Sequence, residues 1–193
     1  MDRSFIVFMH KVQIEKSITP IVSPAVVISV GKWDEANLIT LAWVARVVSN
    51  PPVMSISIRP SRHSFSLIEK LEEFVINVPS TDNIQQMDYC GTRTGREVNK
   101  WEELKLTKEK ATQVEVPLIK EFPINIECKV INKLVHGTHK IYLGEVLAVH
   151  VDESMIKDNR LDPSKQNQIV YVSGNYYGLT KDPLERHGFS LKS

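Results

Sequence analysis

The sequence is poor in cysteine and in long apolar runs, and each shortage argues against a class of protein. Only Cys90 and Cys128 occur in 193 residues, far apart and outside any C-x-x-C or His/Cys pattern, so neither a disulfide framework nor a zinc site is supported. No run approaches the roughly 18 apolar residues of a membrane span. The apolar start Phe5–Met9 is shorter than the roughly 7–15 residues of a signal h-region. We expect a soluble, cytoplasmic protein with two reduced thiols and no bound metal.

Net charge is also nearly absent, at +1 with a pI of about 7.8. A chain without a strong global field is poorly suited to nucleic acid or to an anionic membrane surface. The glycine-rich phosphate motifs G-x-x-x-x-G-K-[ST] and G-x-G-x-x-G are missing as well. We therefore expect a small, locally charged ligand, and no P-loop or Rossmann module to bind it.

What the sequence does contain is a series of short strands. Residues 26–30, 53–58 and 74–78 are rich in β-branched residues and bounded by Pro, Gly or charged residues. Residues 124–130 alternate apolar and polar side chains, which predicts a strand with one solvent-exposed face. A second long strand, 140–151, follows a tight Gly-containing connection at 136–139, which predicts an antiparallel hairpin. This strand-rich order favours a barrel.

Helical periodicity is limited to two segments. Residues 64–73 repeat apolar side chains at three- to four-residue steps, with Ser64 as the expected N-cap, and residues 81–89 follow Ser80 or Thr81 as a cap. Residues 158–168 are polar and predict a surface loop, and residues 181–193 a loosely held tail. We expect one domain over 1–193, with its core in 20–180.

Two segments of the first half suit a flat polar ring that carries a phosphate. Residues 59–64, Arg-Pro-Ser-Arg-His-Ser, end a strand and open a helix, where guanidinium, hydroxyl and free N–H groups converge. In residues 37–43, alternate side chains of a regular strand bring Asn37 and Trp43 to one face, where they would flank a ring. The alternatives are a solvated basic turn for the first segment and a core Trp43 for the second.

Three later segments add groups for the same ligand. Residues 90–96 hold Gly91 and Gly95, which allow close backbone approach, and lead to Lys100, a cation suited to an anionic ring edge. His139, with its near-neutral pKa, ends the hairpin connection. Residues 173–178, Ser-Gly-Asn-Tyr-Tyr-Gly, bring aromatic rings. Taken singly, each has a plain alternative: a surface lysine, an inert turn histidine, or aromatic packing.

In their order and spacing, these motifs from Asn37 to Tyr177 resemble the flavin reductase-like FMN-binding family, the flavoredoxin and NAD(P)H:flavin oxidoreductase group. The resemblance implies a mainly β fold with a few helices, a split β-barrel, and a homodimer that binds FMN non-covalently near the subunit interface. Thr138 departs from the acid often found there, which leaves the partner of His139 open. Carried over residue by residue, the FMN-binding set comprises Asn37, Thr40, Ala42, Trp43, Arg59, Ser61, Arg62, Ser64, Cys90, Gly91, Thr92, Lys100, His139 and Tyr176 (or Tyr177), with Lys100 and His139 tuning the flavin.

The resemblance further implies an enzyme that transfers hydride from NADH or NADPH to bound FMN, and electrons onward to free flavin, ferric iron or a protein acceptor. A flavoredoxin-type electron carrier or flavin store shares every motif and remains an alternative. Two others are a strand-rich barrel that stacks single-stranded nucleic acid on its aromatic side chains, and a haem-binding or pyridoxamine phosphate oxidase relative.

Overall fold

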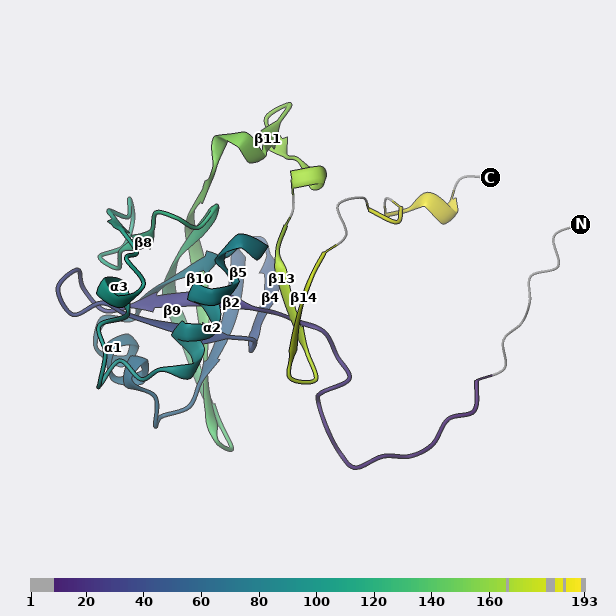
Figure 1. Cartoon of the computed structure of the whole chain (residues 1–193), viewed down its shortest axis with the longest axis horizontal. Coiled ribbons are helices and arrows are strands. Elements are labelled where there is room, and N and C mark those ends of the chain that lie inside the picture. The colour runs from purple at the N-terminus through teal and green to yellow at the C-terminus, as the bar shows by residue number, and fades with distance from the viewer. Residues whose placement is uncertain (1–8, 166, 180–182, 186, 192–193) are drawn as a thin grey trace, which may run out of the picture.

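The central element is a seven-stranded antiparallel sheet that brings distant parts of the chain together (Figure 1). The computed structural model describes residues 9–165, 167–179, 183–185 and 187–191. The spatial order is β3-β2-β6-β9-β10-β5-β4. The strands are β2 (Val26–Val30), β3 (Asn37–Leu41), β4 (Val44–Ser49), β5 (Pro52–Ile58), β6 (Glu73–Val78), β9 (Ile124–His136) and β10 (His139–Val151).

The two edge strands, β3 and β4, follow one another in the chain and are separated only by Ala42 and Trp43. The backbone N–H of Ser57, on β5, donates to the carbonyl of Trp43 at 3.0 Å, which extends the β4–β5 pairing up to this junction. A connection of two residues keeps the two edges of the sheet close together. The sheet therefore curls back on itself, which confirms the mainly β fold of the split-barrel type. Its interior holds one apolar cluster that includes Val26, Ile28, Ile39, Leu41, Ile56, Ile58, Ile68, Phe74, Ile76 and Tyr142, all of them buried.

The predicted hairpin is confirmed, with His139 paired to His136 and the register running to Val151 opposite Ile124. The predicted solvent-exposed face of 124–130 is wrong, because Asn125 and Glu127 are buried. Residues 112–119 cover that face of the sheet and direct their backbone groups at these two side chains. The alternating polar residues Asn125 and Glu127 therefore make hydrogen bonds to the covering loop instead of facing solvent.

The helices lie close to their expected places but begin and end differently. Helix α1 spans His63–Leu71, and Arg62 is its N-cap; the predicted cap, Ser64, is wrong because it lies inside the helix and is buried. The second helical segment starts as the single turn η1 (Thr81–Asn83), with Ser80 in a capping box, and continues as α2 (Ile84–Thr92). The short α3 (Lys100–Glu103) was not expected from the sequence.

The remaining elements are small and surround the barrel. Strands β1 (Ser23–Pro24), β13 (Ile169–Val172) and β14 (Asn175–Gly178) form a three-stranded sheet, and β7 (Lys108–Glu109) pairs with β8 (Leu118–Ile119). The predicted loop 158–168 is not wholly irregular, because Arg160 and Leu161 form β12, which pairs with β11 (Ile156–Lys157). Three further single turns are η2 (Glu153–Met155), η3 (Pro163–Lys165) and η4 (Phe189–Leu191).

Both ends of the chain lead away from the barrel (Figure 1). Residues 9–22 form an extended arm without regular structure, and Met9, Val12, Ile14 and Ile18 on it are exposed. Of the apolar start 5–9 only Met9 is among the described residues. Of the expected tail 181–193, residues 181, 182, 186, 192 and 193 lie outside the described residues. Among the helices described, none is long and apolar enough to span a membrane.

Candidate functional site

Two adjoining cavities lie beside β3. One, of about 250 Å³, lies between β3, the start of α1 and the loop after α2, and the other, of about 170 Å³, lies between the ends of β3, β5 and β10. Ile39, Arg62 and Gly91 line both cavities, so the two adjoin. We call this space the flavin groove. Of the predicted binding set it gathers Asn37, Thr40, Trp43, Arg59, Ser61, Arg62, Ser64, Cys90, Gly91, Lys100 and His139.

The polar wall of the groove is built by β3 and α1. Asn37 opens β3 and donates its side-chain N–H to the hydroxyl of Ser64 at 2.8 Å, and both side chains are buried. Gly95 approaches them so closely that a Cβ at position 95 would lie 2.1 Å from the side-chain oxygen Oδ1 of Asn37. Any larger residue at 95 would displace Asn37, so the loop after α2 is fitted against this wall.

Lys100 lies at the bottom of the groove, only 3% exposed, as the first residue of α3. Asn99 caps that turn by accepting from the backbone N–H of Trp101, which fixes the direction of the lysine. Its ammonium donates to the carbonyls of Leu38 at 2.6 Å and Cys90 at 2.7 Å. Burial lowers the pKa of Lys100 to about 8, and the nearby Arg62 adds to this shift. An ammonium has three donors, so one is left for a ligand.

The other end of the groove carries stacked rings. Trp43 and His139 lie with centroids 5.7 Å apart and an interplanar angle of 21°. Trp43 is 45% exposed, so the alternative of a core tryptophan is wrong. The junction between two edge strands holds this side chain at the surface, where it offers a flat face to a ligand.

The hydrogen bonds of His139 define its protonation. Arg59 donates from Nε to Nε2 of His139 at 3.3 Å, and the hydroxyl of Thr138 lies 2.9 Å from Nδ1. Since Nε2 accepts, the ring proton is on Nδ1, and Thr138 is the partner that the sequence left open. Burial, and next the charge of Arg59, lower the pKa of His139. The imidazole is therefore neutral at pH 7.

Several predicted residues have their polar groups engaged elsewhere. Thr40 donates its hydroxyl to the carbonyl of Met87. Cys90 is buried, and burial raises its pKa to about 12, so it lines the groove as an uncharged thiol. Thr92 is exposed, does not line either cavity of the groove, and donates back to the carbonyl of Asp88 at 3.0 Å.

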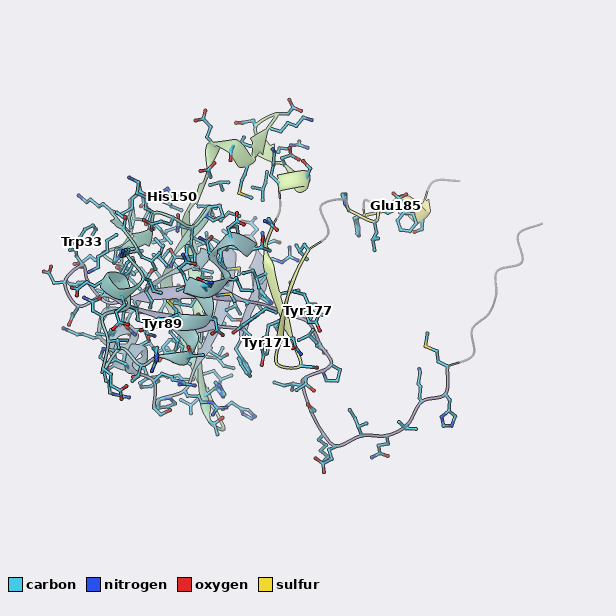
Figure 2. The ribbon with its side chains drawn as sticks, viewed as in Figure 1. Trp33, Tyr89, His150, Tyr171, Tyr177 and Glu185 are labelled. Atoms are coloured by element: carbon cyan, nitrogen blue, oxygen red, sulfur yellow. The ribbon has the colours of Figure 1, made fainter. Side chains whose placement is uncertain are left out.

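The two aromatic candidates of the last motif lie outside the groove. Tyr176 is half-buried, packs against Tyr171, and donates to a carboxylate oxygen of Asp88 at 3.0 Å; burial raises its pKa to about 12. Tyr177 is exposed, and Figure 2 shows it on the β13–β14 hairpin. Ala42 also lies outside, in a separate pocket that it shares with Trp43.

Sequence reasoning missed part of the groove wall. Arg93, Thr94, Arg96 and His63 line the larger cavity, and Arg96 donates to the carbonyl of Ser61 at 3.0 Å. The signal was available, because these residues lie between or next to the glycines and serines already singled out. Burial and the charges of Arg96 and Lys100 lower the pKa of His63.

The groove fits FMN by the chemistry of its lining. Guanidinium groups of Arg62 and Arg93 line the larger cavity and supply donors for a phosphate. Ile39 and Leu41 provide an apolar floor, and the Trp43–His139 stack provides a flat wall for a ring system. Within the described parts of the chain, no three His, Cys, Asp or Glu side chains are grouped to hold a metal ion.

Comparison with known proteins agrees with this geometry. The model of the family described as flavin reductase like domain matches residues 19–180. An uncharacterized protein of Pyrococcus abyssi is 32% identical over 156 residues, which is 81% of this chain and 89% of that protein. The flavoredoxin of Desulfovibrio vulgaris (Miyazaki F) superposes with a TM-score of 0.87 at 27% identity, covering 95% of this chain and 100% of that one. A flavoredoxin from Methanosarcina acetivorans gives 0.86 at 24% identity, over 95% and 98%, a likeness of fold alone.

Proposed function

The chain belongs to the flavin reductase like domain family, whose chemistry is flavin-related redox, and from that premise we propose that it is an NAD(P)H:flavin oxidoreductase. It binds FMN non-covalently in the flavin groove, takes hydride from NADH or NADPH, and delivers electrons to free flavin, ferric iron or a protein acceptor. The observation that carries the proposal is the groove itself, which joins a cationic end to a stacked aromatic wall.

The cationic end holds the phosphate. Arg62 lies where the two cavities meet, next to Ser61, and the hydroxyl of Ser64 closes the same wall. Charge-assisted hydrogen bonds from a guanidinium to phosphate are among the strongest that a protein makes, and two serine hydroxyls complete the donor set. Arg96 keeps the backbone of Ser61 in place through its hydrogen bond to that carbonyl.

The other end positions the ring. When bound, FMN supplies a ring that accepts a hydride and passes electrons on. Trp43 and neutral His139 present flat faces to that ring, and Arg59 fixes the imidazole orientation. Lys100, mostly protonated at pH 7, lines the cavity of the cationic end instead, where its one remaining N–H favours negative charge on the ligand. These residues bind and orient the reactants; hydride transfer itself needs no acid or base from the chain.

The surface next to the groove supports a homodimer. Exposed apolar side chains lie on β4, β9 and β10, the strands that flank Trp43 and His139 in the sheet; they are Val47, Val48, Ile131, Leu134, Val135, Leu147 and Val149. Exposed apolar side chains in such number are typical of protein interfaces. We propose a second copy of this chain as its partner, which sedimentation of the FMN-loaded protein would test. A monomer at micromolar concentration would contradict it.

The two free, buried thiols of Cys90 and Cys128 support a reducing, cytoplasmic location. The remaining alternative is a flavoredoxin-type electron carrier with little NAD(P)H turnover. It shares the same groove and the same FMN.

Anaerobic reduction separates the enzyme from the carrier. The FMN-loaded protein is mixed with NADH and, separately, with NADPH, and the flavin absorbance is followed. We expect bleaching within seconds with one of the two nucleotides. A yellow protein that neither nucleotide bleaches within minutes, while dithionite does, would be the carrier. A protein that retains no FMN at micromolar concentration would contradict both.

A further inference from the structure

A second pocket lies on the far side of Trp43. It measures about 430 Å³ and is enclosed by three separate parts of the chain: the end of the extended arm at residues 18–23, strands β4 and β5, and the β13–β14 hairpin. Trp43 and Ser57 line both this pocket and the flavin groove, so the two spaces share a wall. We call it the side pocket. Its volume is in the range of small-molecule sites, about 300–1,000 Å³.

The arm and the hairpin close the side pocket together. Ser173, at the tip of the hairpin, donates its hydroxyl to the carbonyl of Thr19 at 3.2 Å, and Ser23 pairs with Tyr171 across β1 and β13. Figure 2 shows Tyr171 on this hairpin, which lies next to the barrel. The pocket is therefore built by tertiary contacts between segments about 150 residues apart, as the separation of 154 residues between Thr19 and Ser173 shows.

The side pocket and the flavin groove differ in charge. The groove is lined by arginines and Lys100, whereas the described lining of the side pocket contains no Asp, Glu, Lys, Arg or His. Its walls are apolar or aromatic, with Ile18, Ile21, Val44 and Tyr171 among them. An ionic group placed here would lose hydration without gaining an opposite charge, so the pocket favours an uncharged ligand.

Two serine hydroxyls in the otherwise apolar walls can orient a bound ligand. Ser55 and Ser57 alternate along β5, so they project from the outer face while Ile56 and Ile58 point into the core. Neither hydroxyl hydrogen-bonds another side chain or backbone group among the described residues. Strand β5 is paired on both sides, with β4 and β10, which holds both serines rigidly. They offer donors to a carbonyl oxygen of a ligand.

We infer that the side pocket binds a further electron acceptor, besides those proposed above, and that this acceptor is an uncharged quinone of one or two rings. Its flat apolar body fits between Trp43 and Tyr171, and a ring carbonyl accepts from Ser55 or Ser57. This assignment rests on the proposed function. Overall, NAD(P)H gives up two electrons and one proton, the quinone takes up two electrons past Trp43 and two protons from solvent, and the products are NAD(P)⁺ and the hydroquinone, both carbonyls having become hydroxyls, with a net uptake of one proton.

Binding of menadione, an uncharged two-ring quinone, tests the assignment directly. Equilibrium dialysis is run with FMN-loaded and FMN-free protein, so the readout does not depend on turnover. We expect saturable binding to both, and binding of the anionic 1,2-naphthoquinone-4-sulfonate weaker by about tenfold or more, because its charge must be desolvated. Equal affinities for the two quinones, or no menadione binding by a protein that retains FMN, would overturn the assignment.

A pair of isosteric variants locates the binding. Ser55→Asp introduces a carboxylate and should weaken menadione binding about tenfold. Ser55→Asn introduces a side chain of the same shape as Asp but without charge, and should change menadione binding less than about threefold. Ala45→Trp, at an exposed position of the pocket rim, should block binding even where Ser55→Asp fails to fold. Unchanged binding in Ala45→Trp would overturn the assignment. FMN retention and bleaching by NAD(P)H, measured on the same samples, report separately whether the proposed function fails.

Discussion

Two regions of this protein bury polar side chains, and they differ in what those side chains face. In the flavin groove, Asn37, Ser64 and Lys100 are anchored on one side and line a cavity on the other. In the region that we call the loop clasp, Asn77, Asn125 and Glu127 hold the loop 112–119 on the sheet, and their polar atoms face other protein groups. Burial of a polar group therefore does not by itself mark a binding site. A buried polar group marks a site when one side of it faces a cavity.

The loop clasp is saturated with hydrogen bonds. The Glu127 carboxylate, 0% exposed, accepts from the backbone N–H groups of Thr112 at 2.8 Å, Gln113 at 2.6 Å and Val114 at 3.0 Å, and lies 2.5 Å from Nε2 of His150. Burial alone would raise the pKa of Glu127, but these hydrogen bonds outweigh it and hold the pKa below its usual value. The loop clasp thus stabilises the fold, whereas the flavin groove binds a ligand. Three changes would test this difference.

The largest effect is expected in the clasp. Glu127→Gln replaces an acceptor with a donor that faces N–H groups, and should lower the free energy of unfolding by about 3 kcal/mol, measured by urea denaturation. FMN affinity of the folded fraction should stay within about twofold. Because its folded pKa is lowered, the contribution of Glu127 is present above the unfolded value of 4.5 and is lost as the pH falls below it.

Lys129→Gln, on the same strand but exposed, is the control for the clasp and should leave stability unchanged. A Glu127→Gln protein as stable as the parent would remove the distinction between the two regions.

The next effect is expected in the groove. Arg62→Ala removes a guanidinium from the point where both cavities meet and should weaken FMN binding by about 2 kcal/mol, roughly 30-fold, with little change in unfolding. FMN titration followed by flavin fluorescence measures it. Arg46→Ala, on β4 and outside the groove, is the control. Equal losses in the two variants would mean that general charge, rather than the groove, attracts the phosphate.

The smallest effect is the titration of Lys100. As the pH rises from 7 to 9 the ammonium, whose pKa burial lowers to about 8, loses its charge, and FMN affinity should fall by about 0.5–1 kcal/mol. Lys100→Met should abolish this pH dependence. The pKa of Lys100 in the folded protein lies below the usual lysine value of 10.5, so the folded state binds fewer protons between these values, and unfolding measurements should show stability rising there with pH. A flat affinity profile in the parent would place Lys100 outside the binding event.

The sequence predicted the strands and the residues of the groove better than their surroundings. The hairpin at 136–139 was found because its turn and its long flanking strands are local features. The solvent-exposed face of Asn125 and Glu127 was wrong because the loop that covers it comes from a different part of the chain. Tyr176 and Thr92 were expected at the ligand, and the structure directs both toward Asp88 instead.

The sequence by itself determined the β-rich fold, the cationic turn 59–64 and the order of the motifs, because period-two alternation, turn chemistry and charge are encoded over a few neighbouring residues. Only the tertiary structure decided which polar groups face a cavity, how Lys100 is buried between two backbone carbonyls, and that Thr19 meets Ser173 to enclose the side pocket. Such placements depend on packing between segments far apart in the chain, which no local pattern records.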